Sequence, residues 1–145
     1  MPLSPSETRE LSAFAGTMIP PSARYGVPGA DDETIFADVL KSLGRDRDDV
    51  VAALKRLAAL AGGPFADLAA DRRREVAAAF RAEGGMALAA ISRVILLCYY
   101  RDDRVMRSLG QEPRPPFPKG HIVEQGDWSL LDPVKARNPF YRKVT

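Results

Sequence analysis

The chain has 145 residues, enough for one domain with a single hydrophobic core but too few for two full domains. Hydrophobic residues make up 46% of the sequence and charged residues 28%, which is typical of globular proteins and excludes wholesale disorder. A net charge of +2 is too small to indicate a protein that binds nucleic acid.

The first two predicted helices are marked by the residues at their N-termini. Residues 4–7, Ser-Pro-Ser-Glu, match a capping box with proline at the first helical position, and Pro20-Pro21 ends this helix. After a loop, Asp31 and Asp32 begin a second helix, because the helix dipole favours negative charge at that end. Gly44 is expected to stop it. The predicted buried positions are Leu11, Phe14, Ala15 and Met18 in the first helix and Ile35, Val39 and Leu43 in the second.

Two more helices are predicted over residues 46–63 and from about Asp71 to Gly85. The third closes at Gly62-Gly63, and the fourth follows a turn around Phe65 and Leu68. Three adjacent arginines, residues 72–74, spread around the circumference of a helix, so we interpret them as solvated surface. The predicted buried positions are Val50, Leu54, Leu57 and Ala61 in the third helix and Val76 and Phe80 in the fourth.

The fifth predicted helix, residues 86–100, is the most apolar segment. Only Ser92 and Arg93 interrupt it, so we expect it to be buried on nearly every side at the centre of the bundle. It continues to Gly110, with or without a break, because Ile95, Cys98, Val105 and Leu109 keep one face. With no strand pattern before residue 110, the sequence predicts an all-α bundle of about five helices over residues 1–110.

The composition changes over residues 111–145, which hold six of the twelve prolines. The "PRPPFP" segment favours extended or polyproline II backbone, while the bulky residues that follow, such as Trp128, are unlike those of a disordered tail. We therefore predict an extended C-terminal arm that docks either on its own bundle or on another protein.

Catalytic and metal-binding patterns are sparse. The chain has no glycine-rich nucleotide motif and no nucleophile elbow, and its one cysteine and one histidine provide too few ligands for a Cys/His zinc site. Cys98 lies in an apolar run and is predicted to be a buried, inert thiol. The spacing of His121, Glu124, Asp127 and Asp132 matches no metal motif. We therefore expect no bound metal, no cofactor and no intrinsic enzymatic activity.

Targeting and membrane signals are also missing from the sequence. Its N-terminus has no basic region followed by an apolar one, so we predict no secretory signal and a cytoplasmic location. The longest apolar stretch, "VILLCYY", has seven residues, far fewer than the roughly 20 needed to cross a bilayer.

Arginines recur after the fifth helix, at Arg101, Arg104 and Arg107, and Asp103 can pair with Arg107 at i,i+4. One interpretation is a solvated amphipathic face. The other is a polar rim around a protein interface anchored by the preceding tyrosine pair, since tyrosine, tryptophan and arginine dominate interface energetics. The tyrosines are equally compatible with the core if their hydroxyls find partners at its edge.

Three segments carry a family resemblance, over about Leu11 to Arg137: "TMIPPS", "CYYRDDRVMRSLG" and "RPPFPKGHIVEQGDWSLLDPVKAR". They resemble the gluconate 2-dehydrogenase subunit 3 family. Members of this family are small, non-flavin subunits that accompany large flavoprotein dehydrogenases of the glucose-methanol-choline (GMC) oxidoreductase superfamily. None of the three segments is a catalytic signature.

The resemblance implies a non-catalytic accessory subunit that stabilises or matures the large one. FAD would be bound by the large subunit, which oxidises a sugar or alcohol, and in several such systems a cytochrome c subunit takes the electrons. Nucleic acid and direct membrane insertion are not expected. The positions assigned to the interface are Tyr99, Tyr100, Arg101, Arg104, Pro115, Pro116, Phe117 and Trp128.

One departure from the family concerns export. Its members often carry a twin-arginine signal, whereas this sequence begins directly at its first helix. The complex is therefore expected in the cytoplasm, or in the periplasm if the partner carries the signal.

Two other functions remain open. In one, the chain is a stand-alone adaptor whose "PRPPFP" segment binds a polyproline-reading domain. In the other, it is a small enzyme that uses Tyr100, Arg104 and His121.

Overall fold

The computed structural model describes residues 2–115, 117, 120 and 124–138. It divides into an N-terminal unit, Met1–Pro113, and a C-terminal unit, Arg114–Thr145, which we describe separately. Every regular element within the described residues is helical, apart from one isolated β-bridge between Ser22 and Val27. The predicted all-α class is therefore confirmed.

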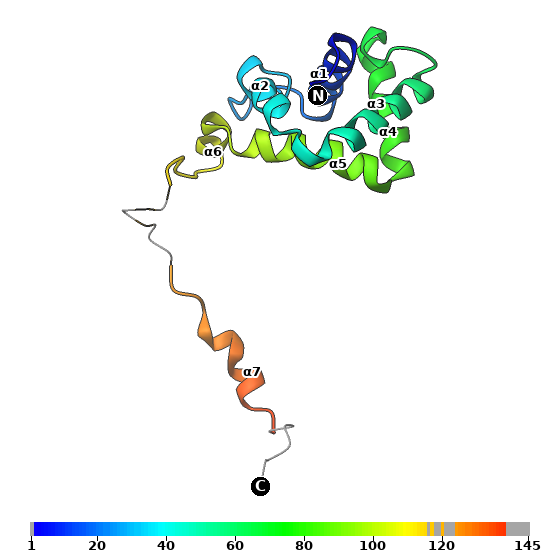
Figure 1. Ribbon diagram of the computed structural model, residues 1–145. Helices are drawn as coiled ribbons and strands as arrows, with labels where there is room; N and C mark the ends of the chain where they lie inside the picture. The colour runs from blue at the N-terminus through cyan, green and yellow to red at the C-terminus, as the bar shows by residue number, and fades with distance from the viewer. Residues whose placement is uncertain (1, 116, 118–119, 121–123, 139–145) are drawn as a thin grey trace. The chain divides into compact units, whose positions relative to one another are not determined.

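The helices follow one another closely in the N-terminal unit (Figure 1). Two 3-10 turns, η1 and η2, precede α3 and α4, and the C-terminal unit contains one 3-10 turn and one short helix. The elements are α1 (Pro5–Met18), α2 (Glu33–Ser42), η1 (Gly44–Asp46), α3 (Arg47–Ala61), η2 (Phe65–Asp67), α4 (Ala70–Glu83), α5 (Gly85–Tyr100), α6 (Asp103–Ser108), η3 (Trp128–Leu131) and α7 (Asp132–Lys135).

The helix ends form where the capping residues predict them. Ser4 and Glu7 complete the capping box: the Glu7 amide donates to Ser4 Oγ at 3.2 Å, and the Ser4 amide donates to Glu7 Oε2 at 2.8 Å. Asp32 caps α2, because its Oδ1 accepts from the Thr34 amide at 3.1 Å. Gly62 ends α3 with a left-handed φ of 74°, a conformation that suits glycine.

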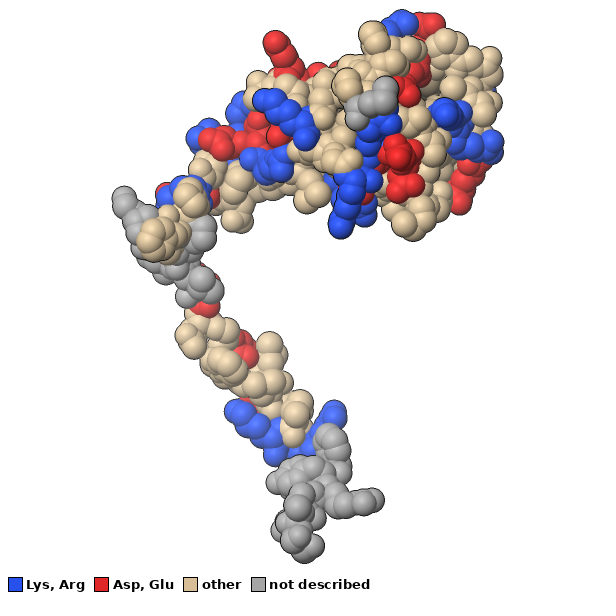
Figure 2. All heavy atoms as spheres, viewed as in Figure 1, with Lys and Arg blue, Asp and Glu red and all other residues tan. Residues whose placement is uncertain are grey.

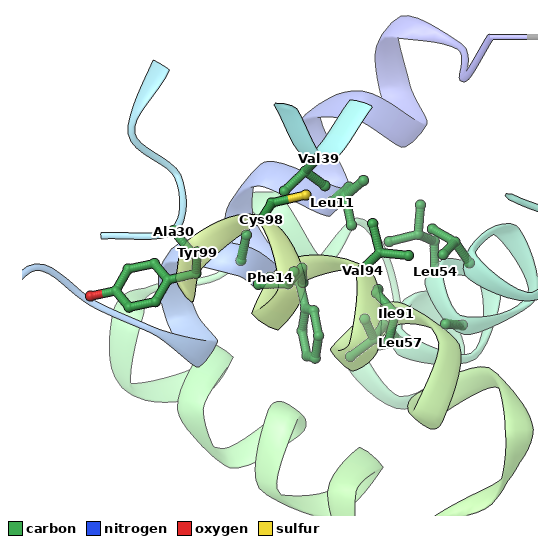
Figure 3. Packing of buried hydrophobic residues seen from close by; sticks show 14 of the residues in the cluster. Leu11, Phe14, Ala30, Val39, Leu54, Leu57, Ile91, Val94, Cys98 and Tyr99 are labelled. Carbon is green, nitrogen blue, oxygen red and sulfur yellow. The ribbon is translucent and has the colours of Figure 1, made fainter. Parts of the chain in front are cut away.

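The core of the N-terminal unit lies among helices that α3 joins together. Helix α3 packs against both α5 and α4, α2 also packs against α5, and α1 packs against α4 and η2. Phe14 of α1 makes edge-to-face contacts with Phe65 and Phe80, at ring-centroid distances of 6.1 and 6.0 Å. Figure 3 shows side chains from these helices meeting in the interior, among them Leu11, Val39, Leu54, Leu57, Ile91 and Val94.

Helix α5 departs from the prediction. We expected it to be buried on nearly every side, but only the face with Ala90, Ile91, Val94, Ile95, Cys98 and Tyr99 is buried, and apolar residues on the opposite face are exposed. The reason is that α2 and α3 cover one face of α5, whereas α4 packs mainly on α3 and α1, and α1 packs mainly on α4 and η2.

A break separates α5 from α6. Asp102 caps the new helix by accepting from the Arg104 amide at 2.9 Å. Val105 continues the buried face as predicted, but the prediction for Leu109 is wrong, because that side chain is exposed.

The C-terminal unit contains η3 and α7, which follow one another directly and pack together. Asp127 begins η3, since its Oδ1 accepts from the Ser129 amide at 3.0 Å. The described residues between Gln111 and Asp127 form no helix, and none of the described residues of this unit is buried. Within the described part of the chain, no helix is long and apolar enough to cross a membrane.

Candidate protein-interaction surface

An apolar strip runs along the uncovered face of α5. Met86, Leu97 and Tyr100 are 74%, 60% and 54% exposed, and Leu96 lies beside them at the edge of the core. Residues three, four or seven positions apart share one face of a helix, so these side chains form a continuous row with Ala89 and Arg93 between them. We call Met86, Leu96, Leu97 and Tyr100 the α5 strip.

Arg93, in the middle of this row, is held by its own chain. Its Nη2 and Nε donate to Asp46 of η1 at 2.5 and 3.3 Å. Because this ion pair neutralises the guanidinium, the row presents apolar side chains around a paired charge.

A groove of about 590 Å³ adjoins the strip, between α5 and the pair formed by α1 and α4. We call it the α5 groove. Its apolar lining includes Met18, Ile19, Ala77, Leu88, Leu96 and Tyr100. Two arginines of α4, Arg74 and Arg81, also line it.

Both charged residues that line the groove, Arg74 and Arg81, are positive. Arg74 pairs with Asp71, one turn away, while Arg81 makes no ion pair within the part of the chain that the structure describes. Arg72 likewise pairs with Glu75, so it and Arg74 lie on the surface as predicted, whereas Arg73 is half-buried.

The two predicted interface tyrosines occupy different environments. Tyr99 is a core residue, and its hydroxyl donates to the Pro28 carbonyl at 3.2 Å, which matches the alternative of a core tyrosine satisfied at the edge. Burial raises the pKa of this hydroxyl. The ring of Tyr100 packs edge-on against that of Tyr99, with 5.4 Å between the ring centroids, and it reaches the surface at the end of the α5 strip.

Arg101 ties the end of α5 to α2. Its Nε donates to Asp38 Oδ2 and its Nη2 to Ser42 Oγ, both at 2.5 Å. The hydrogen bond from Arg101 lowers the pKa of the Asp38 carboxyl. Cys98 lies buried beside this pair as predicted, and its burial raises the pKa of the thiol. The assignment of Arg101 to an interface therefore rests on the sequence alone.

Arg104 bridges the capping residues of two helices. Its Nη2 and Nη1 donate to Asp32 at 2.7 and 3.2 Å, and its Nε and Nη2 donate to Asp102 at 3.0 Å each. One guanidinium thus holds the N-terminus of α6 against that of α2. Arg107 makes the predicted i,i+4 pair with Asp103, at 3.1 Å.

Because of this bridge, the free energy of unfolding is expected to fall as the solution becomes acidic. Hydrogen bonds from Arg104 lower the folded-state pKa values of Asp32 and Asp102 below the ordinary 3.8. Carboxylates whose folded pKa is depressed stabilise the fold above the unfolded-state pKa, and the stabilisation is lost as the pH falls through the lowered value. The stabilisation from Asp32 and Asp102 is therefore lost over a pH range that begins just above 3.8 and extends below it.

We expect Arg104→Met to lower the free energy of unfolding by about 1 kcal/mol at pH 7, allowing for solvent screening of a half-exposed guanidinium. Urea titrations at several pH values between about 7 and about 2.5 should show the two proteins converging in acid, because protonated carboxyls no longer attract Arg104. Arg107→Met, which removes an exposed pair, is the control and should cost only about 0.3 kcal/mol. A constant difference between Arg104→Met and the native chain at every pH would contradict this account.

The predicted interface residues of the arm lie in the C-terminal unit. Pro115, Phe117 and Trp128 are exposed there. Pro116 and His121 lie outside the described residues. The interface role of these positions stays a prediction.

Acidic, histidine and cysteine side chains are too scattered in the described ranges to form a metal site. No three of them lie close enough together there to hold an ion. Two of the residues named from the sequence have local partners instead: Asp127 caps η3, and Asp132 pairs with Lys135 at 3.1 Å. Glu124 is exposed.

A scan against protein-family models gives no match, and searches of curated proteins and of solved structures give none either.

Sequence reasoning identified Tyr100 but missed the rest of the surface around it. In "VILLCYY" the buried residues alternate at helical spacing with Leu96, Leu97 and Tyr100. The presence of apolar residues on every face of this helix could have indicated the surface. A helix at the edge of a small bundle has neighbours from its own chain on only one side, so its other apolar face is exposed. The groove arginines gave no such signal, since they lie on a different helix.

Proposed function

We propose that this chain is a non-catalytic accessory subunit that binds a large FAD-dependent oxidoreductase of the GMC type and supports its folding or stability. The observation that carries the proposal is the α5 strip. Monomeric proteins seldom expose extended apolar patches, and such patches mark interaction sites. The strip also has the methionine and tyrosine that are enriched at protein interfaces.

The identity of the partner comes from the resemblance of the sequence to the small subunits of such flavoproteins. FAD is assigned to the partner, and no residue of this chain is given a role in binding it. The partner's substrate is a sugar or alcohol, and a cytochrome c subunit is a further candidate member of the complex. We place the complex in the cytoplasm, with co-export to the periplasm on the partner's signal as the alternative.

Co-expression tests this proposal. The GMC-type flavoprotein encoded nearest to this chain is produced with and without it, and the FAD in the soluble fraction is measured by absorbance. We expect soluble, FAD-loaded flavoprotein only when this chain is present. A flavoprotein that is equally soluble and active alone would rule out the stabilising role.

A further inference from the structure

The α5 strip and the α5 groove form one elongated surface. From Met86 to Tyr100 the helix advances about 21 Å at about 1.5 Å per residue, which is the length of a partner helix of about four turns. Leu96 and Tyr100 belong to both the strip and the groove, so a helix lying along α5 would contact the two together. Helices commonly bind in apolar grooves between other helices through one amphipathic face.

The charged side chains that line the groove are positive. Arg74 and Arg81 line the groove, and no aspartate or glutamate of the described residues does. This is a local property, because positive and negative side chains are interspersed over the visible face of the N-terminal unit (Figure 2). A second surface hollow, of about 690 Å³, is lined by both Asp31 and Arg73 and thus has no single sign.

Arg81 is the stronger of the two determinants. Arg74 already has a carboxylate within its own helix, whereas Arg81 has no ion-pair partner among the described residues. A carboxylate brought beside Arg81 would therefore form a new pair without displacing an existing one. Next to an apolar partner face, where water is excluded, such a pair gains strength over one in open solvent.

We propose that the surface made by the α5 strip and the α5 groove binds an acidic amphipathic helix of a partner protein. The apolar face of that helix covers Leu96, Leu97 and Tyr100, and its flanking carboxylates pair with Arg81 and Arg74. The inference rests on the proposed function only in assigning this helix to the flavoprotein, since the surface itself is argued from this chain.

Two synthetic peptides test the proposal on the full-length chain. Both are fluorescein-labelled helices of about 16 residues with leucines at i, i+3, i+4 and i+7, flanked by glutamates in one and by lysines in the other. Fluorescence anisotropy at about 50 mM salt should show the glutamate peptide binding at least about 10-fold more tightly than the lysine peptide, because screening is weak at this ionic strength. Leu97→Asp should abolish binding, whereas Leu109→Asp, at a similarly exposed leucine, should not.

Charge reversal provides the sharper comparison. Arg81→Glu should remove the preference for the glutamate peptide or reverse it. Lys55→Glu changes the net charge equally at an exposed residue of α3 that lines neither the groove nor the strip, and should leave the preference within about two-fold. Circular dichroism establishes whether each variant is folded. If Leu97→Asp is not folded, Leu97→Ala takes its place.

Several results would overturn the proposal. Equal affinity for the two peptides, or no binding of either, would exclude an acidic helix as the occupant. Concentration-dependent dimers of the native chain that Leu97→Asp dissociates would assign the surface to a second copy. None of these results alters the co-expression outcome, so failure of this inference is distinguishable from failure of the proposed function.

Discussion

Replacing Phe80 by alanine is expected to lower the free energy of unfolding by about 3–5 kcal/mol, a large part of the total stability of a small domain. Phe80 is fully buried, and it joins α4 to α1 through its edge-to-face contact with Phe14. Removing the ring eliminates that contact and leaves a cavity that the surrounding helices fill only in part. Urea denaturation followed by far-ultraviolet circular dichroism measures the loss.

Leu97→Ala is the matched control for this prediction. It removes a large apolar side chain from α5, but this side chain is mostly exposed, so the expected cost is below about 0.5 kcal/mol. Similar losses for Phe80→Ala and Leu97→Ala would mean that Leu97 is buried and that the α5 strip does not exist as a surface.

Replacing Leu97 by aspartate is expected to weaken binding of the proposed flavoprotein partner by about 30-fold or more. This corresponds to about 2 kcal/mol, the usual threshold for a residue that dominates an interface. A carboxylate at this position would have to be desolvated against the apolar face of the partner, without a compensating pair. Isothermal titration calorimetry of the two purified subunits measures the affinity.

Leu109→Asp separates this effect from a general effect of an added charge. Leu109 is 57% exposed, close to the value for Leu97, but it follows α6 and lies outside the α5 strip. Its substitution should leave the affinity within about two-fold. Equal losses at Leu97 and Leu109 would place the interface elsewhere on the chain.

Much of the fold was predictable because its determinants are local. The Ser4–Glu7 capping box, the Asp32 cap and the glycine stop at Gly62 each act within a few residues, and each lies where the sequence predicts. The apolar periodicity likewise identified buried residues such as Val39 and Phe80. Local signals of this kind need no knowledge of which helices become neighbours.

The candidate surface was less predictable because it depends on which helices pack together. The apolar sequence of α5 gives no information on whether its second face meets another helix of this chain or a partner, and so the expectation of burial on nearly every side was wrong. The ion pairs of Arg101 with Asp38 and of Arg104 with Asp32 join residues 63 and 72 positions apart. No periodic pattern encodes pairs at such separations.

The proposed function has this chain join a flavoprotein complex through the α5 strip. Light scattering with absorbance detection on the co-expressed pair, separated by size-exclusion chromatography, tests this proposal. We predict a single peak that contains both chains and FAD, and separate elution of the two chains for Leu97→Asp. Separate peaks for the native chains, with all of the FAD in a stable flavoprotein, would contradict the account.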